Sequence, residues 1–267
     1  MSSSKQQAAK QLQLKLELEV ALKPKLLKLF RRIAREFRTA VAKTGRPQEA
    51  AQYRDAFAAV IAVHDKKVQS AFRARALRTT KSAEPVEDDS DAEALALLLL
   101  LWRTDQAAAA AVQITETNVG QMDDAIVEAR AQLQQERVQA ATDGKVTAPA
   151  SNREVAALAA VLLLRKFNAR APLIALTETQ AAAESTKFIE AEHESEAAGE
   201  GKPRKRWATV GDRLVRGTHA DANGQTVDFD TAFIVGGAQL RYPGDRSLGA
   251  PASETMNCRC AALYTEG

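Results

Sequence analysis

The sequence predicts a mainly helical protein that ends in a small α+β module with short antiparallel strands. Hydrophobic residues make up 45% of the 267-residue chain and aromatic residues only 5%, so the apolar content is mostly Ala, Leu and Val, which favours helices. Apolar residues recur at helical spacing through the first part of the chain, whereas glycine, proline and short strand-like runs gather after Gly199. A chain of this length commonly forms two domains, which we place at residues 1–168 and 169–267.

The N-terminal region is expected to contain helices near residues 10–44, 47–81, 90–112, 119–142 and 152–167. The first of them begins with QLQLKLELEV, residues 11–20, in which every second residue is Leu or Val. That alternation is typical of a strand, but Gln, Lys, Glu and Leu are helix formers, and we favour a helix. Its leucines would then form two stripes, so both sides need partners, such as another subunit.

Three local patterns in the helical region predict specific roles. His64 lies on an apolar helix face and is expected to be a core histidine held by a hydrogen bond, since no second ligand type sits at helical spacing. Thr115 and Thr177 each open the tripeptide Thr-Glu-Thr and resemble N-caps. Capping boxes are expected to start two helices, after an acidic connector at residues 82–90 and near residue 151; their residues are Ser90 with Glu93 and Ser151 with Glu154.

The C-terminal module is expected to combine one helix, residues 177–195, with short strands. Turn signals at Asn223-Gly224, Gly236-Gly237 and Pro243-Gly244 separate the strand-like runs. Those runs are residues 207–210, 226–229, 233–235 and 258–264.

The charge and hydropathy of the chain exclude some classes of protein. A net charge of +3 is too small to indicate a dedicated nucleic-acid binder, and the basic stretches 25–38, 73–81 and 202–206 are expected to be mostly solvated. The residues that can still contact phosphate are Lys202, Arg204, Lys205 and Arg206. The longest apolar run, residues 94–102, is shorter than a membrane span, and the N-terminus lacks a signal-peptide pattern, so we expect no membrane span.

The two cysteines, Cys258 and Cys260, are expected to be small buried residues. A Cys2His zinc site with His219, and Asp212 as fourth ligand, is the main alternative, and a catalytic thiol is another. On a regular strand, however, residues two apart stand about 6.5–7 Å from each other, too far for tetrahedral ligands unless the strand bends. The spacing also differs from the usual C-x(2–4)-C, so we expect no metal and no cofactor.

One cluster of polar residues could support chemistry on phosphate: Asp212, Arg213, Arg216 and His219. We expect it to lock a loop instead, because no second carboxylate or nucleophile is spaced to complete a mechanism, and we predict no enzymatic activity. Arg259 would point away from the cysteines on a regular strand, towards Asp245 or Asp212. We prefer a buried pair that ties the last strand to the Pro-Gly-Asp turn.

An ordered set of residues resembles the C-terminal module of the bacteriophage Mu F-like head morphogenesis proteins, or minor head proteins, over roughly residues 170–264. The set consists of Thr177, Glu178, Thr179, Trp207, Asp212, Arg213, Arg216, His219, Gly224, Phe233, Gly236, Gly237, Pro243, Gly244, Asp245, Asn257, Cys258, Arg259 and Cys260. Relatives often carry Arg and Asn where this chain has Leu176 and Glu184, so roles that depend on these two positions are not carried over.

The resemblance implies a non-enzymatic virion protein that acts in procapsid assembly, or in DNA packaging and ejection, at the portal vertex inside the capsid. Its implied partners are the portal protein, the major capsid protein or both, with self-association and non-specific contacts to double-stranded DNA as further options. Synthesis would take place in the host cytoplasm. Some relatives carry toxin domains beyond the module, and none is expected in this chain. The alternatives are a DNA-binding internal virion protein and a nuclease or nucleotide-handling enzyme that uses His219 and Asp212.

Overall fold

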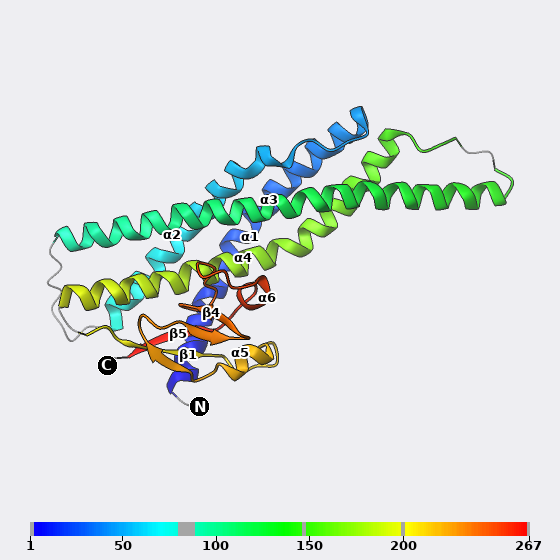
Figure 1. Cartoon of the computed structure of the whole chain (residues 1–267). Helices are drawn as coiled ribbons and strands as arrows, with labels where there is room; N and C mark the ends of the chain where they lie inside the picture. The colour runs from blue at the N-terminus through cyan, green and yellow to red at the C-terminus, as the bar shows by residue number, and fades with distance from the viewer. Residues whose placement is uncertain (1–2, 80–88, 146–147, 199–200, 266–267) are drawn as a thin grey trace. The chain divides into compact units, whose positions relative to one another are not determined.

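The computed structural model describes residues 3–79, 89–145, 148–198 and 201–265. Long helices dominate the chain, and short strands follow them, as the sequence predicts (Figure 1). The helices are α1 (Ser3–Thr44), a 3-10 turn η1 (Ala50–Tyr53), α2 (Arg54–Thr79), α3 (Asp89–Thr142), α4 (Asn152–Ala198), α5 (Gly217–Asp221) and α6 (Ala252–Thr255). The strands are β1 (Arg204–Ala208), β2 (Thr226–Asp228), β3 (Phe233–Val235), β4 (Ala238–Leu240) and β5 (Ala261–Thr265).

Two of the helices are longer than the sequence patterns predict. Helix α3 continues through residues 113–118, and α4 continues through residues 168–176 with Pro172 inside it. Thr115 and Thr177 therefore lie within helices, 3% and 1% exposed, and the prediction that they are N-caps is wrong. A threonine hydroxyl is tolerated inside a helix when it finds a partner, and Thr177 Oγ1 accepts a hydrogen bond from the backbone N–H of Asn257.

The predicted starts of the helices agree better with the structure. Ser151 and Glu154 form the expected capping box, in which Glu154 Oε2 accepts from Ser151 N at 2.8 Å and Ser151 Oγ accepts from Glu154 N at 3.3 Å. Helix α3 begins at Asp89, next to the predicted cap. The acidic connector lies almost entirely outside the described residues. Residues 11–20 are helical, as favoured.

The chain divides into two compact units that do not follow sequence order. Unit 1 comprises residues 1–22, 62–106 and 173–267, and unit 2 comprises residues 23–61 and 107–172. The sequence placed a single boundary near residue 168, close to the last of these breaks. Helices α1 and α4 carry a proline, Pro24 and Pro172, beside a break between units, where the missing N–H removes one helical hydrogen bond.

Unit 2 is a helical body with an aromatic centre. Phe30 stacks on Phe167 at 4.3 Å between ring centroids and packs against Phe57 at 5.6 Å. Ile33 and Phe37 complete the apolar face of α1, and both are fully buried. This face follows the helical spacing that the sequence showed.

Unit 1 contains the five strands found among the described residues. Strand β1 lies between β2 and β5 in an antiparallel sheet, and β3 and β4 form a separate hairpin. Strand β4 was not predicted. The cysteines, expected on the last strand, precede β5, which begins at Ala261. The N-terminal end of α1 lies beside the strands (Figure 1), and its Lys15 Nζ donates to the carbonyl of Cys260.

Helix α3 exposes a run of leucines within unit 1. Leu97, Leu98, Leu100 and Leu101 are 44–55% exposed, whereas Leu95 and Leu99 on the opposite face are buried. By length and composition alone, residues 93–142 could cross a membrane, and 28% of the apolar window is buried. Gln69 and Arg103 nevertheless attach this part of α3 to α2, because Gln69 Nε2 donates to Leu99 O and Arg103 donates to Gln69 Oε1.

Candidate functional site

One face of α4 supplies hydrogen-bond partners to the backbone of residues 257–262. Thr177, Gln180 and Glu184 lie three and four residues apart, so they share this face. Thr177 accepts from Asn257 N at 3.1 Å, Gln180 donates to Cys260 O at 2.9 Å, and Glu184 accepts from Ala262 N at 2.8 Å. Side chains of one helix thus form hydrogen bonds to the backbone around the cysteines. These bonds take the place of those that a neighbouring strand would form.

Glu184 is the centre of a buried charge network. Its two carboxylate oxygens bind Lys15 at 2.6 Å and Lys187 at 2.8 Å, and Glu184 and Lys15 are at most 1% exposed. Burial alone would raise the pKa of Glu184, but the two ammonium groups and the Ala262 N–H hold it below its ordinary value. Burial lowers the pKa of Lys187 to about 8. Network and backbone contacts together anchor α1 and the cysteine segment to α4.

His219, Cys258 and Cys260 form a compact cluster beside this face. Their ligand-type atoms lie within 4.8 Å of one another, and the three residues are 1–2% exposed. His219 Nδ1 is 3.4 Å from Cys260 Sγ and 3.7 Å from Cys258 Sγ. The contact between the thiols lowers the pKa of Cys258 to about 5, with His219 acting in the same direction, and raises that of Cys260.

The backbone turns immediately before the two cysteines. Asn257 adopts φ 54°, and it is the one non-glycine position of positive φ in the part of the chain that the structure describes. Residues 258–260 are not part of a strand, so the separation expected from regular strand geometry does not apply. That expectation was wrong because both cysteines precede β5, which begins at Ala261.

Glu254 holds the other side of the imidazole. Its Oε2 lies 3.2 Å from His219 Nε2 and accepts a hydrogen bond from Thr218 Oγ1 at 2.8 Å. The carboxylate also fills the space above Gly236, where an added Cβ would lie 2.9 Å from Glu254 Cδ. Nε2 of His219 thus lies beside the carboxylate without meeting hydrogen-bond geometry, and Nδ1 lies beside the sulfurs.

A pair of glycine variants separates this contact from ordinary backbone strain. Gly236 and Gly237 both have positive φ, 57° and 81°, but an added Cβ at Gly237 meets nothing within 4 Å. We expect Gly237→Ala to lower the free energy of unfolding by about 1 kcal/mol. Gly236→Ala should cost at least about 1 kcal/mol more, because Glu254 must also move. Denaturant titration measures both values, and equal losses would contradict the described contact.

Arg259 pairs with Asp212 and not with the Pro-Gly-Asp turn. Two hydrogen bonds of 2.7 Å join the guanidinium to the carboxylate, and the two side chains are 17% and 43% exposed. Arg259 holds the pKa of Asp212 below its ordinary value. Asp245 instead accepts from the N–H groups of Arg241 and Ser247, each at 2.9 Å. The preferred hypothesis, a buried pair between Arg259 and the Pro-Gly-Asp turn, is therefore wrong.

The proposed phosphate-handling residues do not converge on one site. Asp212 is occupied by Arg259, Arg213 is exposed, and Arg216 donates to the carbonyl of Met256. His219 faces Glu254 and the cysteines. Asp212 as fourth zinc ligand is therefore also wrong, since its carboxylate is engaged elsewhere. The contacts of Asp212 with Arg259 and of Arg216 with Met256 hold the two ends of the loop before α5, whereas Leu214 within it is 78% exposed.

The basic stretch 202–206, which runs into β1, is largely engaged within the module. Lys202 pairs with Asp230 at 3.0 Å, and Arg204 pairs with Asp228 at 3.3 Å. Lys205 is fully buried among the rings of Phe188, Phe229 and Phe233, and burial lowers its pKa to about 8. Lys205 is therefore not a phosphate contact, contrary to expectation, whereas Arg206 remains exposed.

The buried Glu190 on α4 should make the free energy of unfolding depend on pH. Burial raises its pKa to about 7, although Arg73 lies 3.5 Å away. The folded state then binds more protons than the unfolded state between about pH 4.5 and 7, so this group lowers stability as the pH rises. Glu190→Gln should leave the free energy of unfolding nearly unchanged at pH 5 and raise it by about 1–3 kcal/mol at pH 8. Exposed Glu196→Gln is the matched control, and an effect of Glu190→Gln that is equal at both pH values would contradict the assignment.

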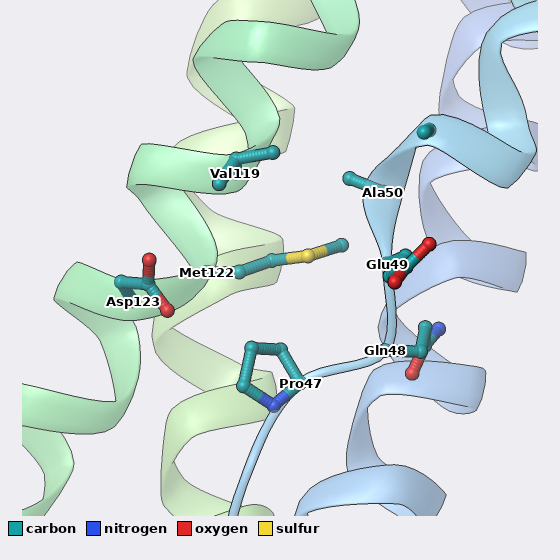
Figure 2. Close-up of a pocket in the computed structure, with 8 residues that line it drawn as sticks. Pro47, Gln48, Glu49, Ala50, Val119, Met122 and Asp123 are labelled. Atoms are coloured by element: carbon teal, nitrogen blue, oxygen red, sulfur yellow. The ribbon is translucent and has the colours of Figure 1, made fainter.

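A surface pocket of about 380 Å³ lies in unit 2, between η1 and α3 (Figure 2). Met122 extends across it towards Ala50, and Pro47 forms part of the wall. The carboxylates of Glu49 and Asp123 also line it, but no histidine, cysteine, lysine or arginine does. The pocket contains no pair of groups that would act as nucleophile and base.

Sequence reasoning missed several residues of the site. Lys15, Gln180 and Glu254 carry no motif, and each acts through a partner far away in the chain. The one available signal was the double stripe of residues 11–20, of which Leu14 and Leu18 pack against a buried cluster while Leu16 stays 40% exposed, so the prediction of partners on both sides is wrong. His64 was placed correctly, since its Nε2 lies 2.7 Å from Thr179 Oγ1 in the buried part of unit 1.

Comparison with known proteins agrees with the resemblance of the motif. A stretch of 60 residues is 37% identical to the NAD(+)--arginine ADP-ribosyltransferase EFV of Enterococcus faecalis (strain ATCC 700802 / V583). It covers 22% of this chain and 12% of that protein. No solved structure matches the chain. The family model described as Phage Mu protein F like protein matches residues 102–263, more than half of the chain. The chain therefore belongs to the Phage Mu protein F like family.

Proposed function

We propose that this chain is a minor head protein that acts without enzymatic activity at the portal vertex, in procapsid assembly or in DNA packaging and ejection. Membership of the family suggests a role in phage head morphogenesis and a place in the virion. The observation that carries the proposal is the family match, which extends from α3 to β5 and includes every strand and the cysteine segment.

The burial of the polar cluster from solvent supports a non-enzymatic role. His219, Cys258 and Cys260 are at most 2% exposed, whereas an active site must admit a substrate to its reactive atoms. Asp212, the acid of the alternative enzyme site, is bound by Arg259 on both oxygens. These groups hold the module together and leave no free acid and base facing a common space.

The exposed leucines of α3 support a protein partner. Monomeric proteins rarely leave a contiguous apolar surface uncovered, and the run 97–101 presents four exposed leucines on one helix. We assign this surface to contact with the portal protein. A double variant, Leu97→Ser with Leu101→Ser, should reduce incorporation into particles, while Val138→Ser, at an equally exposed position further along α3, should not.

Purified particles provide the test of the proposal. The protein should be present at low copy number by quantitative mass spectrometry, and it should co-purify with portal protein at high salt. Association that is lost in salt would favour a DNA-binding internal protein, because phosphate contacts weaken steeply with ionic strength. Hydrolysis of nucleic acid that His219→Ala abolishes would favour the enzyme alternative. Absence from particles, or normal heads without the gene, would reject the proposal.

A further inference from the structure

The cluster of His219, Cys258 and Cys260 has the dimensions of a metal site. A tetrahedral zinc ion with Zn–S near 2.3 Å and Zn–N near 2.0–2.1 Å places its nitrogen and sulfur ligands about 3.6 Å apart. The distances from His219 Nδ1 to the two sulfurs are 3.4 and 3.7 Å. Both contacts therefore have the edge length that a tetrahedral zinc site requires.

The surroundings of the cluster match those of a metal-bound histidine. Such a histidine usually directs its second ring nitrogen to a carboxylate, which fixes the tautomer and the ring orientation. Glu254 occupies that place at 3.2 Å from Nε2, and Thr218 and the space above Gly236 hold Glu254 in turn. Nδ1 faces the two sulfurs, where its lone pair would bind a metal when Nε2 carries the proton.

The charge balance of the buried cluster favours a divalent cation. Two thiolates and one Zn²⁺ sum to zero, so a closed site would carry no net charge besides that of Glu254, which binds Thr218. His219, Cys258, Cys260 and Glu254 are all at most 8% exposed, and an uncompensated charge is costly in such a region.

We propose that His219 Nδ1, Cys258 Sγ and Cys260 Sγ bind one zinc ion, with Glu254 as a positioning residue. Two thiolates and an imidazole are a ligand set that suits zinc, and the described residues supply three ligand atoms, so a water or another small ligand takes the fourth position. The two thiol protons leave on binding. The ion joins α5 to the segment before β5, and this role is independent of the proposed place in the virion.

Metal analysis of the full chain tests the site directly. Protein purified without chelator should contain about one zinc ion per chain, and Cys258→Ser with Cys260→Ser should contain almost none. His193→Asn, at a partly exposed histidine of α4, is the matched control and should retain the metal. Glu254→Gln should keep all three ligands but lower zinc affinity by about 10–100-fold.

Cobalt replacement keeps the test decisive if the cysteine variants fail to fold. Wild-type protein loaded with Co²⁺ should show the intense thiolate-to-cobalt absorption and the visible bands of a tetrahedral site. A folded wild-type protein that contains no zinc and shows no thiolate band with cobalt overturns the proposal. Zinc that persists in the double cysteine variant overturns it as well, because the metal would then be bound elsewhere.

Discussion

Glu184→Ala is expected to lower the free energy of unfolding by about 3–5 kcal/mol, since removing one partner of a buried ion pair leaves the other charge uncompensated. Here the change leaves the ammonium groups of Lys15 and Lys187 without their carboxylate partner and the N–H of Ala262 without its acceptor. Denaturant titration followed by circular dichroism measures the loss.

Two companion variants make this experiment specific. Glu196→Ala, at an exposed position of the same helix, should change stability by less than about 0.5 kcal/mol. Lys15→Met should restore part of the stability lost in Glu184→Ala, because the double variant no longer buries an unpaired Lys15. If Glu184→Ala were no more costly than Glu196→Ala, the network would not be the anchor of α1.

Trp207→Ala is expected to cost about 3–5 kcal/mol through the cavity that it leaves in unit 1. The side chain is fully buried and meets Phe233 and His219 edge-on, with centroids 5.3 and 5.5 Å away. It belongs to the same apolar cluster as the two cysteines. Thermal and denaturant unfolding measure the loss, and the fluorescence of the second tryptophan, Trp102, remains as a reporter.

Two other substitutions provide comparisons for the loss of stability in Trp207→Ala. Trp207→Phe should cost clearly less than the alanine variant, because most of the ring contacts remain. Ile234→Ala, at a half-exposed position of β3, should cost less than about 1 kcal/mol. A loss in Trp207→Ala no greater than that of Ile234→Ala would mean that Trp207 is not central to the module.

Local sequence patterns correctly predicted structural features that depend mainly on neighbouring residues. The Ser151–Glu154 box, the helical state of residues 11–20 and the core position of His64 follow from spacing and helix propensity. The Thr-Glu-Thr tripeptides misled because a cap and a buried helical threonine look alike in sequence, and only the distant Asn257 N–H distinguishes them. Tertiary contacts outweighed the local signal there.

The candidate site was harder to predict than the fold for the same reason. Asn is the non-glycine residue that most readily adopts positive φ, as Asn257 does, but nothing in NCRC shows that residues 258–260 lie outside a strand. Lys15 and Glu184 are ordinary surface-type residues by composition, and their burial becomes visible only when α1 and α4 are placed together within unit 1. The family resemblance identified the module, but Glu184 was a position where this chain departs from it.

The discontinuous make-up of unit 1 has a consequence for how the chain is synthesised. Lys15 contacts Gln180, 165 residues later, and Cys260, 245 residues later. At about 5–20 residues per second, the ribosome needs many seconds to supply these partners after the first helix emerges. Unit 2 is encoded entirely between residues 23 and 172, so its sequence is complete far earlier. Until then, Lys15, Leu14 and Leu18 stay without their folded-state partners, which makes early binding by a chaperone an advantage during translation.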